Sequence, residues 1–322
     1  MKLIPLMRLF KNKCIRINAD DILAVLKSKT LFRNWYIIPL LYMFCKVLKL
    51  DLLECKVRVV CKRGRSSIVP LEIWGQVIRG YYYGFIQSIA CSENFIIADD
   101  VKINFCKSKE TINIGIARFK ELCYPILNTL LNTFITNIYG LLNVRNKIVI
   151  DVGAYIGDSA IYFALRGAKK VIAIEPHPLA FKEMLENIKL NNLEKVIAPI
   201  NAGLASRSGG ICIKNVNVEE TESTYHSPGA CDTNVPAITL SEVISKYGVA
   251  GDLFVLKMDC EGCEYDVILN EYEHIKLFEE LVVEYHGSLE NILNMLRKDF
   301  NCLNIKRYNL LYCRRRHGDL AL

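Results

Sequence analysis

The most informative segment of the sequence is Lys147-Ile-Val-Ile-Asp-Val-Gly-Ala-Tyr-Ile-Gly-Asp-Ser159. Its β-branched run predicts a buried strand, and a helical apolar pattern begins after the glycines, at Ala160. A glycine turn between strand and helix lets the backbone approach a ligand closely, because glycine has no Cβ. The helix N-terminus behind the turn favours a negatively charged group. The segment therefore predicts a ligand-binding turn, with a purely structural turn as the alternative.

A second predicted strand follows at the distance of one βαβ unit. The apolar run Val171-Ile-Ala-Ile174 ends in Glu175-Pro176, and Pro178 suits the first turn of the next helix. An acidic residue at the tip of a second parallel strand is placed to accept hydrogen bonds from two ribose hydroxyls. The glycine spacing in front of it differs from the G-x-G-x-x-G fingerprint of nicotinamide dehydrogenases. Glu175 thus favours a nucleoside cofactor other than NAD, with a solvated strand-end acid as the alternative.

Six motifs occur in a specific order along the second half of the chain. They are Val149-Ile-Asp-Val-Gly-Ala-Tyr-Ile-Gly-Asp-Ser159, Ala173-Ile-Glu-Pro-His-Pro178, Asn187-Ile-Lys-Leu-Asn-Asn192, Asn201-Ala-Gly-Leu204, Leu256-Lys-Met-Asp-Cys-Glu-Gly262 and Val282-Val-Glu-Tyr-His286. This series resembles the FkbM family of S-adenosylmethionine-dependent methyltransferases. The resemblance covers residues 140 to 315. Two departures stand out: Tyr155 occupies a position where the family usually has Asn, and Cys260 and Cys263 replace aliphatic residues or Ala.

The resemblance implies a class I, Rossmann-like methyltransferase fold with S-adenosyl-L-methionine as cofactor. It also implies methyl transfer to a hydroxyl, often on a sugar, a glycolipid or another small metabolite. The cofactor is expected at the strand ends described above. The expected cofactor-binding residues are Asp151, Gly153, Ala154, Tyr155, Gly157, Asp158, Ser159, Glu175, Pro176, His177, Asn201, Ala202 and Asp259.

Polar side chains also end two later predicted strands. A hydroxyl that attacks a methylsulfonium needs alignment and help in losing its proton. The expected catalytic residues are therefore Asp259, Glu261, Glu284 and His286. His286 is a reasonable base because an unperturbed imidazole titrates near neutrality. Asp259 or Glu261 could accept the proton instead, or orient the hydroxyl.

The pair Cys260-Glu-Gly-Cys263 is a C-x-x-C motif, which can form half of a zinc site or a redox pair. No second such pair stands nearby in the sequence, and free cysteine packs well as a small hydrophobe. We therefore expect core packing and no bound metal. A hard cation held by the carboxylates of Asp259, Glu261 and Glu284 is the alternative.

Charge is distributed unevenly along the 322 residues. Residues 1 to 65 contain 15 basic and 4 acidic residues, a net charge of +11, whereas the whole chain carries +7 and the remainder is therefore −4. A mildly acidic catalytic part argues against electrostatic binding of nucleic acid. Two alternatives stay open: an RNA methyltransferase that uses the basic N-terminal region, and a non-catalytic membrane-surface protein that keeps the fold.

The apolar run Trp35-Tyr-Ile-Ile-Pro-Leu-Leu-Tyr-Met-Phe44 is about half as long as a membrane span requires, and Pro39 interrupts it. We expect no transmembrane helix. A cap helix packed on the core and an amphipathic segment at an anionic membrane surface are the two interpretations. Without a recognisable secretory signal, we expect a cytoplasmic protein, with peripheral membrane association as a second expectation.

Residues 1–140 are expected to form a basic N-terminal α+β cap, and residues 141–322 the methyltransferase domain. The cap should be helical before residue 50 and over residues 116–142, with short strands and turns between 55 and 106. After residue 147, strands and helices alternate, which is typical of a doubly wound, mostly parallel α/β sheet. The strands are predicted at 148–151, 171–174, 195–199, 253–258, 280–285, 301–306 and 309–314.

The last two predicted strands are too close for a helical crossover and should pair antiparallel at one edge of the sheet. The polar segment 219–236 is the longest predicted loop of this part of the chain. A loop of this length within a compact domain is usually functional or disordered. By the resemblance it lies over the active site, where Tyr225 and His226 could contact substrate.

Overall fold

The structure is a computed structural model, and the chain divides into two compact units, Met1–Cys106 and Lys107–Leu322. The expected domain boundary at residue 140 stays a prediction. The residues that the structure describes are 19–36, 39, 56–62, 65–83, 88–92, 95–98, 101–104, 111–114, 116–120, 129–130, 132–213, 233–248 and 252–316.

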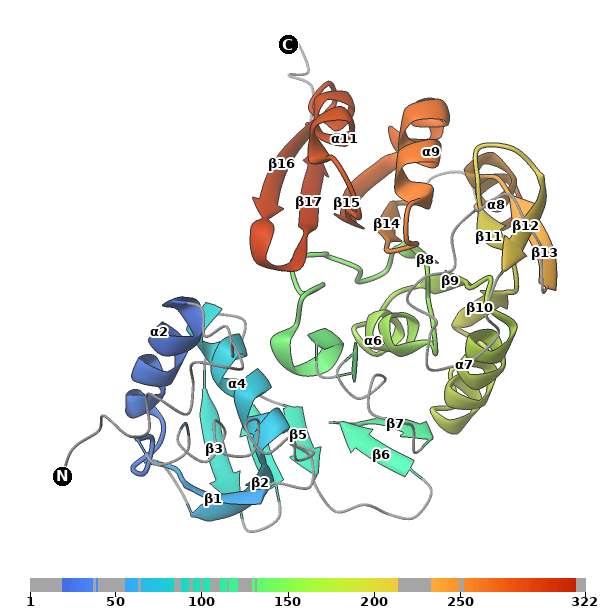
Figure 1. Cartoon of the computed structure of the whole chain (residues 1–322). Helices are drawn as coiled ribbons and strands as arrows, with labels where there is room; N and C mark the ends of the chain where they lie inside the picture. Colours follow the sequence, from blue (N-terminus) through green and yellow to red (C-terminus); the bar gives the residue numbers. More distant parts are fainter. Residues whose placement is uncertain are drawn as a thin grey trace. The chain divides into compact units, whose positions relative to one another are not determined.

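The second unit contains a seven-stranded sheet in the order β10-β9-β8-β14-β15-β17-β16 (Figure 1). Its strands are β8 (Ile148–Val152), β9 (Lys170–Ile174), β10 (Ile197–Ile200), β14 (Phe254–Met258), β15 (Phe278–Glu284), β16 (Phe300–Ile305) and β17 (Leu310–Arg315). The first five are parallel, and β17 runs antiparallel to both β15 and β16. The predicted α/β Rossmann-like fold, its seven strands and its antiparallel edge hairpin are confirmed.

Helices alternate with these strands, as the sequence pattern predicts. They are α6 (Asp158–Leu165), α7 (Pro178–Leu190), α8 (Leu240–Tyr247), α9 (Cys263–Asn270), α10 (Tyr272–Ile275) and α11 (Leu289–Leu296). Every residue of β8 and β14 is buried, as expected for central strands of a parallel sheet that is covered on both faces. The core of the unit therefore lies on the two faces of the sheet.

The strand order reverses between β8 and β14. From β8 the chain continues to β9 and β10 on one side, and from β14 it continues to β15 on the other. In open α/β sheets, the crevice outside the carboxyl ends of the strands at such a reversal is where ligands bind. The turns after β8, β9, β14 and β15 all open onto this edge, so the fold brings the predicted site residues together.

A second, three-stranded sheet follows β10 in the order β11-β13-β12. It consists of β11 (Gly203–Leu204), β12 (Gly209–Ile213) and β13 (Thr233–Ile238). Residues 233–236 therefore belong to a strand, so the predicted loop over 219–236 is wrong at its end. In β13, buried Val235 and Ala237 alternate with exposed Asn234 and Pro236, which is the signature of a half-buried strand. Residues 219–232, with Tyr225 and His226, lie outside the described residues.

The segment before β8 also differs from the prediction. Residues 111–114 and 117–120 form an antiparallel hairpin of β6 (Thr111–Ile114) and β7 (Ala117–Lys120). The expected helix over 116–142 is therefore wrong at its start, because Ala117 and Phe119 are buried while Arg118 is exposed, which is a strand period. One turn of π-helix, η2 (Asn132–Thr136), lies further along, and residues 137–147 run irregularly into β8.

The first unit contains helix and strand elements, as predicted for the cap. They are α2 (Ala19–Lys27), η1 (Ser28–Thr30), β1 (Lys56–Val60), β2 (Ser66–Pro70), α4 (Leu71–Tyr83), β3 (Ile89–Ser92), β4 (Phe95–Ala98) and β5 (Val101–Asn104). Helix α4 corrects the expectation of only strands and turns between 55 and 106. Its buried residues Leu71, Trp74, Val77 and Ile78 recur at helical spacing.

Most of the Trp35–Phe44 segment lies outside the described residues. Among the residues described, no helix is long and apolar enough to cross a membrane. Whether this segment is a packed cap helix or an amphipathic segment at a membrane surface therefore stays a prediction.

The turn after β8 generates a test of the fold. Gly153 has a φ of +72°, and a Cβ on it would lie 1.7 Å from the carbonyl oxygen of Asp259. Gly153→Ala should therefore destabilise the protein by at least about 2 kcal/mol, because neither backbone can move without breaking the sheet edge. Thermal unfolding measures this. Gly209→Ala is the matched control, since a Cβ there meets nothing within 4 Å, and equal melting temperatures for the two variants would contradict the packing described.

Candidate active site

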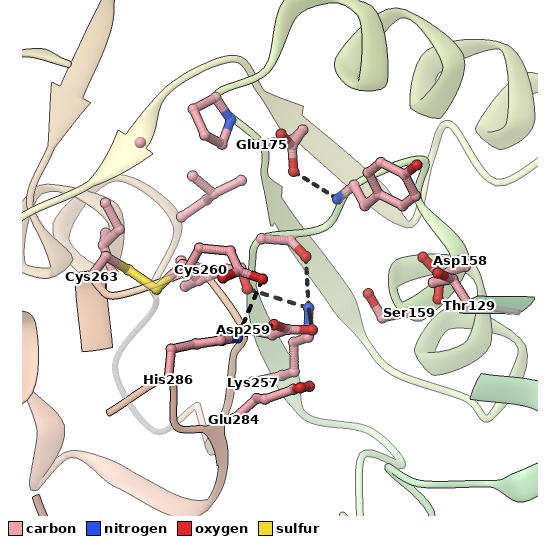
Figure 2. Close-up of a pocket in the computed structure, with 18 of the residues that line it drawn as sticks. Thr129, Asp158, Ser159, Glu175, Lys257, Asp259, Cys260, Cys263, Glu284 and His286 are labelled. Atoms are coloured by element: carbon pink, nitrogen blue, oxygen red, sulfur yellow. Dashed lines mark hydrogen bonds and ion pairs between the residues drawn. A yellow bond between two sulfur atoms is a disulfide. The ribbon is translucent and has the colours of Figure 1, made fainter. Parts of the chain in front are cut away.

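A cavity of about 430 Å³ opens at the carboxyl ends of the central strands (Figure 2). Ten of the residues predicted from the sequence line it, from four different strand ends. They are Gly153, Tyr155, Asp158, Ser159, Glu175, Pro176, Asp259, Glu261, Glu284 and His286. The structure thus brings the predicted catalytic residues and most of the predicted cofactor-binding residues into one site.

The remaining predicted residues lie behind the cavity wall. These are Asp151, Ala154, Gly157, His177, Asn201 and Ala202. The side-chain amide of Asn201 donates to the carbonyl oxygens of Glu175 at 2.9 Å and Pro176 at 3.1 Å, which fixes the turn after β9. His177 caps helix α7, with its ring nitrogen accepting from the backbone of Ala180. These residues support the wall and do not face the cavity.

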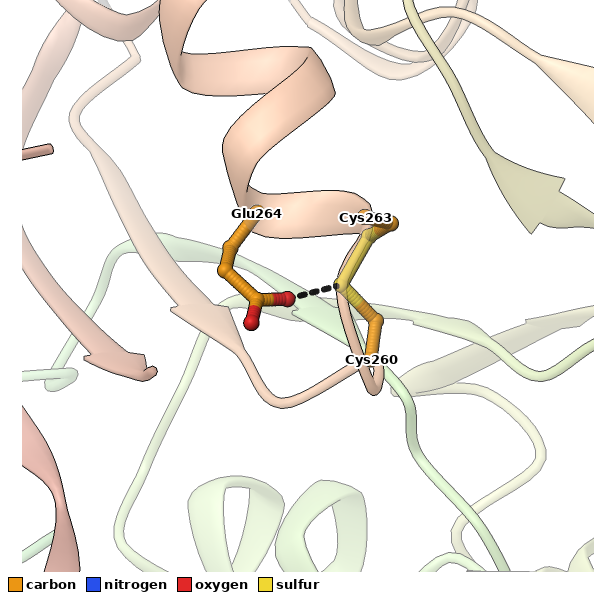
Figure 3. A group of neighbouring side chains, drawn as sticks. All are labelled: Cys260, Cys263 and Glu264. Atoms are coloured by element: carbon orange, nitrogen blue, oxygen red, sulfur yellow. Dashed lines mark hydrogen bonds between the residues drawn. A yellow bond between two sulfur atoms is a disulfide. The ribbon is translucent and has the colours of Figure 1, made fainter. Parts of the chain in front are cut away.

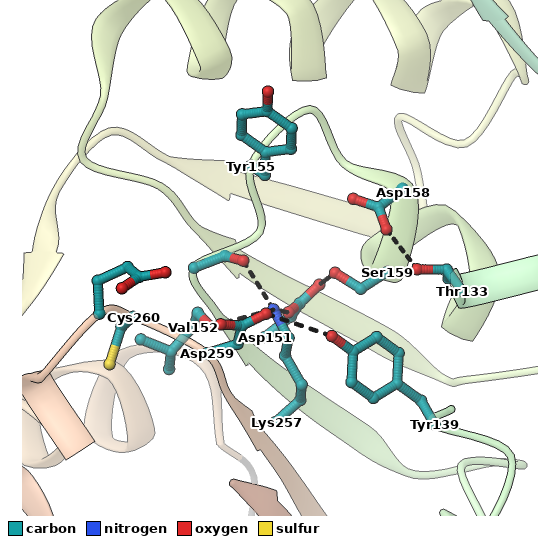
Figure 4. A network of polar contacts seen from close by, with 12 residues as sticks. Thr133, Tyr139, Asp151, Val152, Tyr155, Asp158, Ser159, Lys257, Asp259 and Cys260 are labelled. Atoms are coloured by element: carbon teal, nitrogen blue, oxygen red, sulfur yellow. Dashed lines mark hydrogen bonds and ion pairs between the residues drawn. The ribbon is translucent and has the colours of Figure 1, made fainter. Parts of the chain in front are cut away.

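A buried lysine joins the two central strands beneath the cavity (Figure 4). The Nζ of Lys257 lies 2.7 Å from the carbonyl oxygen of Gly153 and 3.3 Å from that of Val152. It lies 3.3 Å from Oδ1 of Asp151 and 3.8 Å from Oδ2 of Asp259. Burial favours the neutral amine, but these carboxylates outweigh it and raise the pKa of Lys257. Lys257 is therefore a charged ammonium that holds the glycine turn in place.

Asp151 completes this buried network. One of its oxygens accepts from the hydroxyl of Ser159 at 2.7 Å, and the other faces Lys257. Burial raises the pKa of Asp151, while the ammonium of Lys257 opposes the rise. Asp151 therefore acts from below the site, by anchoring the start of helix α6 to the end of β8.

Glu175 presents a carboxylate at the tip of β9. Its two oxygens accept backbone N–H bonds from Tyr155 at 2.7 Å and from His177 at 2.8 Å. Burial raises the pKa of Glu175 to about 7, and these two bonds limit the rise. A carboxylate has about four acceptor positions, so two remain for a ligand. The binding of ribose hydroxyls by Glu175 stays a prediction.

Tyr155 adopts a left-handed backbone conformation, with a φ of +49°. Asn adopts this region several-fold more readily than most residues, whereas a bulky side chain rarely does. The sequence departure noted at this position therefore lies at a strained point of the turn. Its backbone N–H still reaches Glu175, so the hydrogen bond that shapes the turn does not depend on the side chain.

His286 lies among three carboxylates at the end of β15. Its Nε2 is 3.3 Å from Glu261 and 3.9 Å from Asp259, and its Nδ1 is 3.0 Å from the buried Glu264. The hydrogen bonds to Glu261 and Glu264 raise the pKa of His286 to about 10. The imidazole is therefore protonated at neutral pH, which removes its ability to accept a proton there.

Glu284 lines the same cavity as His286 (Figure 2). Burial raises the pKa of Glu284, and the nearby charge of Asp259 raises it further. A carboxyl of raised pKa is a stronger base, once ionised, than an ordinary one. With its pKa raised to about 8, Glu284 can accept a proton in its ionised form, which predominates above that pH.

The sequence analysis did not identify Tyr139 and Thr133, which also line the cavity. The hydroxyl of Tyr139 lies 3.4 Å from Oδ2 of Asp259, and its ring centroid is 5.6 Å from Nζ of Lys257. The hydroxyl of Thr133 donates to Asp158 at 2.6 Å, and burial raises the pKa of that carboxyl to about 6. Both residues precede β8, in a segment without a recognisable motif, so no sequence signal pointed to them.

The two cysteines of the C-x-x-C motif form a disulfide on the cavity wall (Figures 2 and 3). The expectation of core packing is right for Cys263, which is buried, but the pair is bonded and not free. Disulfide sulfurs are poor metal ligands. The ligand atoms of Asp259, Glu284 and His286 converge within 4.8 Å of one another, so a cation held there stays an open alternative.

Residues 151–303 match the methyltransferase FkbM domain. Methyltransferase sdnD of Sordaria araneosa is 25% identical over 198 residues, which cover 52% of this chain and 71% of that protein. Uncharacterized protein 158B of Sulfolobus islandicus rod-shaped virus 1 is 26% identical over 160 residues, covering 50% of this chain and 73% of that one.

Among solved structures, methyltransferase FkbM from Methylobacillus flagellatus KT aligns with a TM-score of 0.38 and 17% identity, over 58% of this chain and 53% of that one. The family match covers the glycine turn, Glu175 and the strand ends that form the cavity. The resemblance of the sequence motifs is thereby confirmed. The chain is a class I S-adenosylmethionine-dependent methyltransferase, and its residues 151–303 form a domain of the FkbM family.

Proposed function

We propose that the protein transfers the methyl group of S-adenosylmethionine to a hydroxyl of an uncharged acceptor, such as a sugar, a glycolipid or a small metabolite. The observation that carries the proposal is the gathering of Asp259, Glu261, Glu284 and His286 in the cavity that also contains the glycine turn and Glu175. One end of this cavity suits a nucleoside, and the other offers groups that orient and deprotonate a hydroxyl.

The residues fit the cofactor. Gly153 has no side chain, so the turn after β8 can lie directly against a ligand. Glu175 offers two acceptor positions toward the cavity for ribose hydroxyls. Bound in this way, S-adenosylmethionine supplies an electrophilic methyl group on a sulfonium. The chain has to orient the acceptor hydroxyl in line with that group and to remove its proton.

We assign proton removal to a carboxylate. His286 is protonated at neutral pH, so its proposed part is to hold Glu261 and Glu264 in place as their positive partner. Burial and the charge of Asp259 raise the pKa of Glu284 despite the opposing charges of His286 and Lys257, and its ionised form suits a general base. Asp259, contacted by both Lys257 and Tyr139, is better placed to orient the hydroxyl.

The charge of the cavity supports an uncharged acceptor. Five carboxyl groups line it: Asp158, Glu175, Asp259, Glu261 and Glu284. The basic residues among the described lining are Lys257 and His286, and both already contact carboxylates. A phosphorylated acceptor would bring a further negative charge into this field, which costs free energy. We therefore expect neutral hydroxyl compounds to be better acceptors than RNA.

The cofactor assignment predicts that S-adenosylhomocysteine, the demethylated product, binds and that NAD does not. Glu175→Ala should weaken binding by roughly 1.5–3 kcal/mol for each hydrogen bond lost. Isothermal titration calorimetry measures the change, with exposed Glu194→Gln as the control. Wild-type affinity in Glu175→Ala would remove this assignment.

The same carboxyl predicts a pH dependence of binding. Its pKa is about 7 in the free protein, so below that pH it is increasingly protonated and accepts fewer hydrogen bonds. The affinity for S-adenosylhomocysteine should therefore fall as the pH drops from 8 to about 6. In Glu175→Gln this dependence should disappear. Calorimetry over that range tests it, and identical profiles for the two proteins would exclude the role.

The catalytic assignment predicts that Glu284→Gln lowers turnover by about 10²–10⁴, while binding of S-adenosylhomocysteine survives. Gln keeps the size of the side chain but accepts no proton. Turnover is measured as transfer of a labelled methyl group to glycan and lipid extracts. Glu261→Gln and His286→Ala should also lower turnover, through loss of positioning. Normal turnover in all three variants would mean that alignment alone drives the reaction.

We also propose that the basic N-terminal region brings the enzyme to an anionic membrane that carries its acceptor. The net charge of +11 in residues 1 to 65 supports this, since each basic residue near such a surface contributes about 1 kcal/mol, screened by salt. The protein should co-sediment with liposomes containing phosphatidylserine at low salt and be released at high salt. Neutral liposomes are the control, and no binding to anionic liposomes at low salt would end the proposal.

A further inference from the structure

We propose that Cys260 and Cys263 are a reversible thiol–disulfide site in the wall of the active-site cavity, reduced by dithiols, and that their bond sets the affinity for the cofactor. The inference rests on the proposed function only in placing the cofactor in this cavity. Figure 3 shows the pair at the start of helix α9, beside Glu264. Both cysteines line the cavity, and neither is part of the proposed proton transfer.

The disulfide closes the turn that carries two of the proposed catalytic residues. Cys260 directly follows Asp259, and Glu261 lies inside the closed ring. Glu261 has a φ of +54° and Gly262 a φ of +117°. A non-glycine residue in the left-handed region costs about 1–2 kcal/mol, so this turn needs a constraint to hold it. The bond between Cys260 and Cys263 spans the strained residues and supplies one.

The turn contacts the cofactor loop directly. The carbonyl oxygen of Asp259 packs against the Cα of Gly153, where even a Cβ would overlap it. The backbone N–H of Asp259 donates to the carbonyl oxygen of Val152 at 3.0 Å. A relaxation of the turn at Asp259 would therefore move the glycine turn against which the cofactor is proposed to bind.

Glu264 links the disulfide to His286. Its Oε2 lies 3.4 Å from Sγ of Cys260 and accepts from the backbone of Gly262 at 2.9 Å. Its Oε1 accepts from the backbone of His286 at 3.1 Å and contacts the imidazole at 3.0 Å. In the reduced protein, the thiol of Cys260 has this carboxylate as a ready acceptor. Both redox states are thus accommodated, as a reversible site requires.

The chemistry balances with a dithiol as the reductant. One thiolate of the dithiol attacks Sγ of Cys260, which is partly exposed in the cavity, whereas Cys263 is buried. The S–S bond breaks, Cys263 leaves as a thiolate and takes up a proton, and a mixed disulfide forms on Cys260. The second thiol of the reductant then attacks its own sulfur in that mixed disulfide. Cys260 is released as a thiol, and the reductant is oxidised to its disulfide by two electrons.

The chain contains a matched reference pair. Cys302 and Cys313 form a disulfide between β16 and β17, at the far edge of the same sheet. Their residues do not line the cavity; Cys302 is partly exposed and Cys313 is buried within the core. Backbone pairing of β16 and β17 holds these two residues opposite each other, whereas Cys260–Cys263 closes a strained turn. Because strained disulfides are the more easily reduced ones, the Cys302–Cys313 pair should be reduced later, and its reduction should leave the cofactor site unchanged.

The experiment titrates the full-length protein with dithiothreitol, traps free thiols by alkylation and identifies them by mass spectrometry, and measures S-adenosylhomocysteine binding by calorimetry in parallel. We expect Cys260 and Cys263 to be alkylated before Cys302 and Cys313. At that point the affinity should have fallen about fivefold or more, and reoxidation should restore it. Protein with Cys260→Ala and Cys263→Ala should bind equally with and without dithiothreitol. Protein with Cys302→Ala and Cys313→Ala should respond like the wild type.

Two results would overturn the proposal. One is unchanged affinity in wild-type protein whose Cys260 and Cys263 are fully alkylated. The other is reduction of the Cys302–Cys313 pair first. If the oxidised protein binds no S-adenosylhomocysteine at all, it is the proposed cofactor site that fails, and the order of alkylation then decides the redox site separately.

Discussion

The buried ammonium of Lys257 is the interaction on which the site depends. It lies at the one place where the sheet order reverses, and it contacts the ends of β8 and β14 together. A buried charge costs several kcal/mol unless it is paired and hydrogen-bonded. Here two carbonyl oxygens and the carboxylate of Asp151 compensate it. Because Asp151 also holds Ser159, the ammonium fixes the strand, the glycine turn and the start of helix α6 as one unit.

The same constraint shapes the electrostatics of the cavity. Lys257 lines the cavity and is already paired with Asp151 and Asp259, so it offsets only part of the negative charge of the carboxylates that face inward. His286 is the other cation of the described lining, and Glu261 and Glu264 hold it protonated. The electrostatic field that remains in the cavity is therefore negative. Such a field suits a cationic sulfonium and a neutral hydroxyl. Burial, with the charge of Asp259 as a second cause, raises the pKa of Glu284 toward the range in which a carboxyl serves as a base.

Much of the second unit could be predicted from the sequence, for physical reasons. Strands buried on both faces are continuous β-branched runs such as Ile148-Val-Ile150, and a glycine turn or an acid marks each carboxyl end. Strand β7 has four residues, which is too short for periodicity to separate a strand from a helix. Helix α4 was missed although its buried apolar residues recur at helical spacing. The expected loop over 219–236 was wrong at its end because β13 contains Asn234 and Pro236, which are typical of turns and disfavoured in strands.

The site was predicted less completely than the fold. The residues that end strands follow from topology, but Tyr139 reaches Asp259 across 120 residues, and no local pattern records that contact. Lys257 is part of the motif Leu256-Lys-Met-Asp-Cys-Glu-Gly262. Its contacts with Val152, Gly153 and Asp151 arise only because β8 and β14 are neighbours in the sheet. His286 looked like a base from its ordinary pKa. Its neighbours Glu261 and Glu264 make it a cation instead, and only the structure brings them together.

The central claim is that the cavity between Glu175 and Glu284 binds the cofactor with its ribose on the first and its sulfur toward the second. A crystal structure with S-adenosylhomocysteine bound tests this most directly. We expect ribose hydroxyls within hydrogen-bond distance of the Glu175 carboxylate, the backbone of Gly153 against the ligand, and the thioether sulfur facing Asp259 and Glu284. A ligand bound elsewhere, or one whose ribose leaves Glu175 uncontacted, would contradict it.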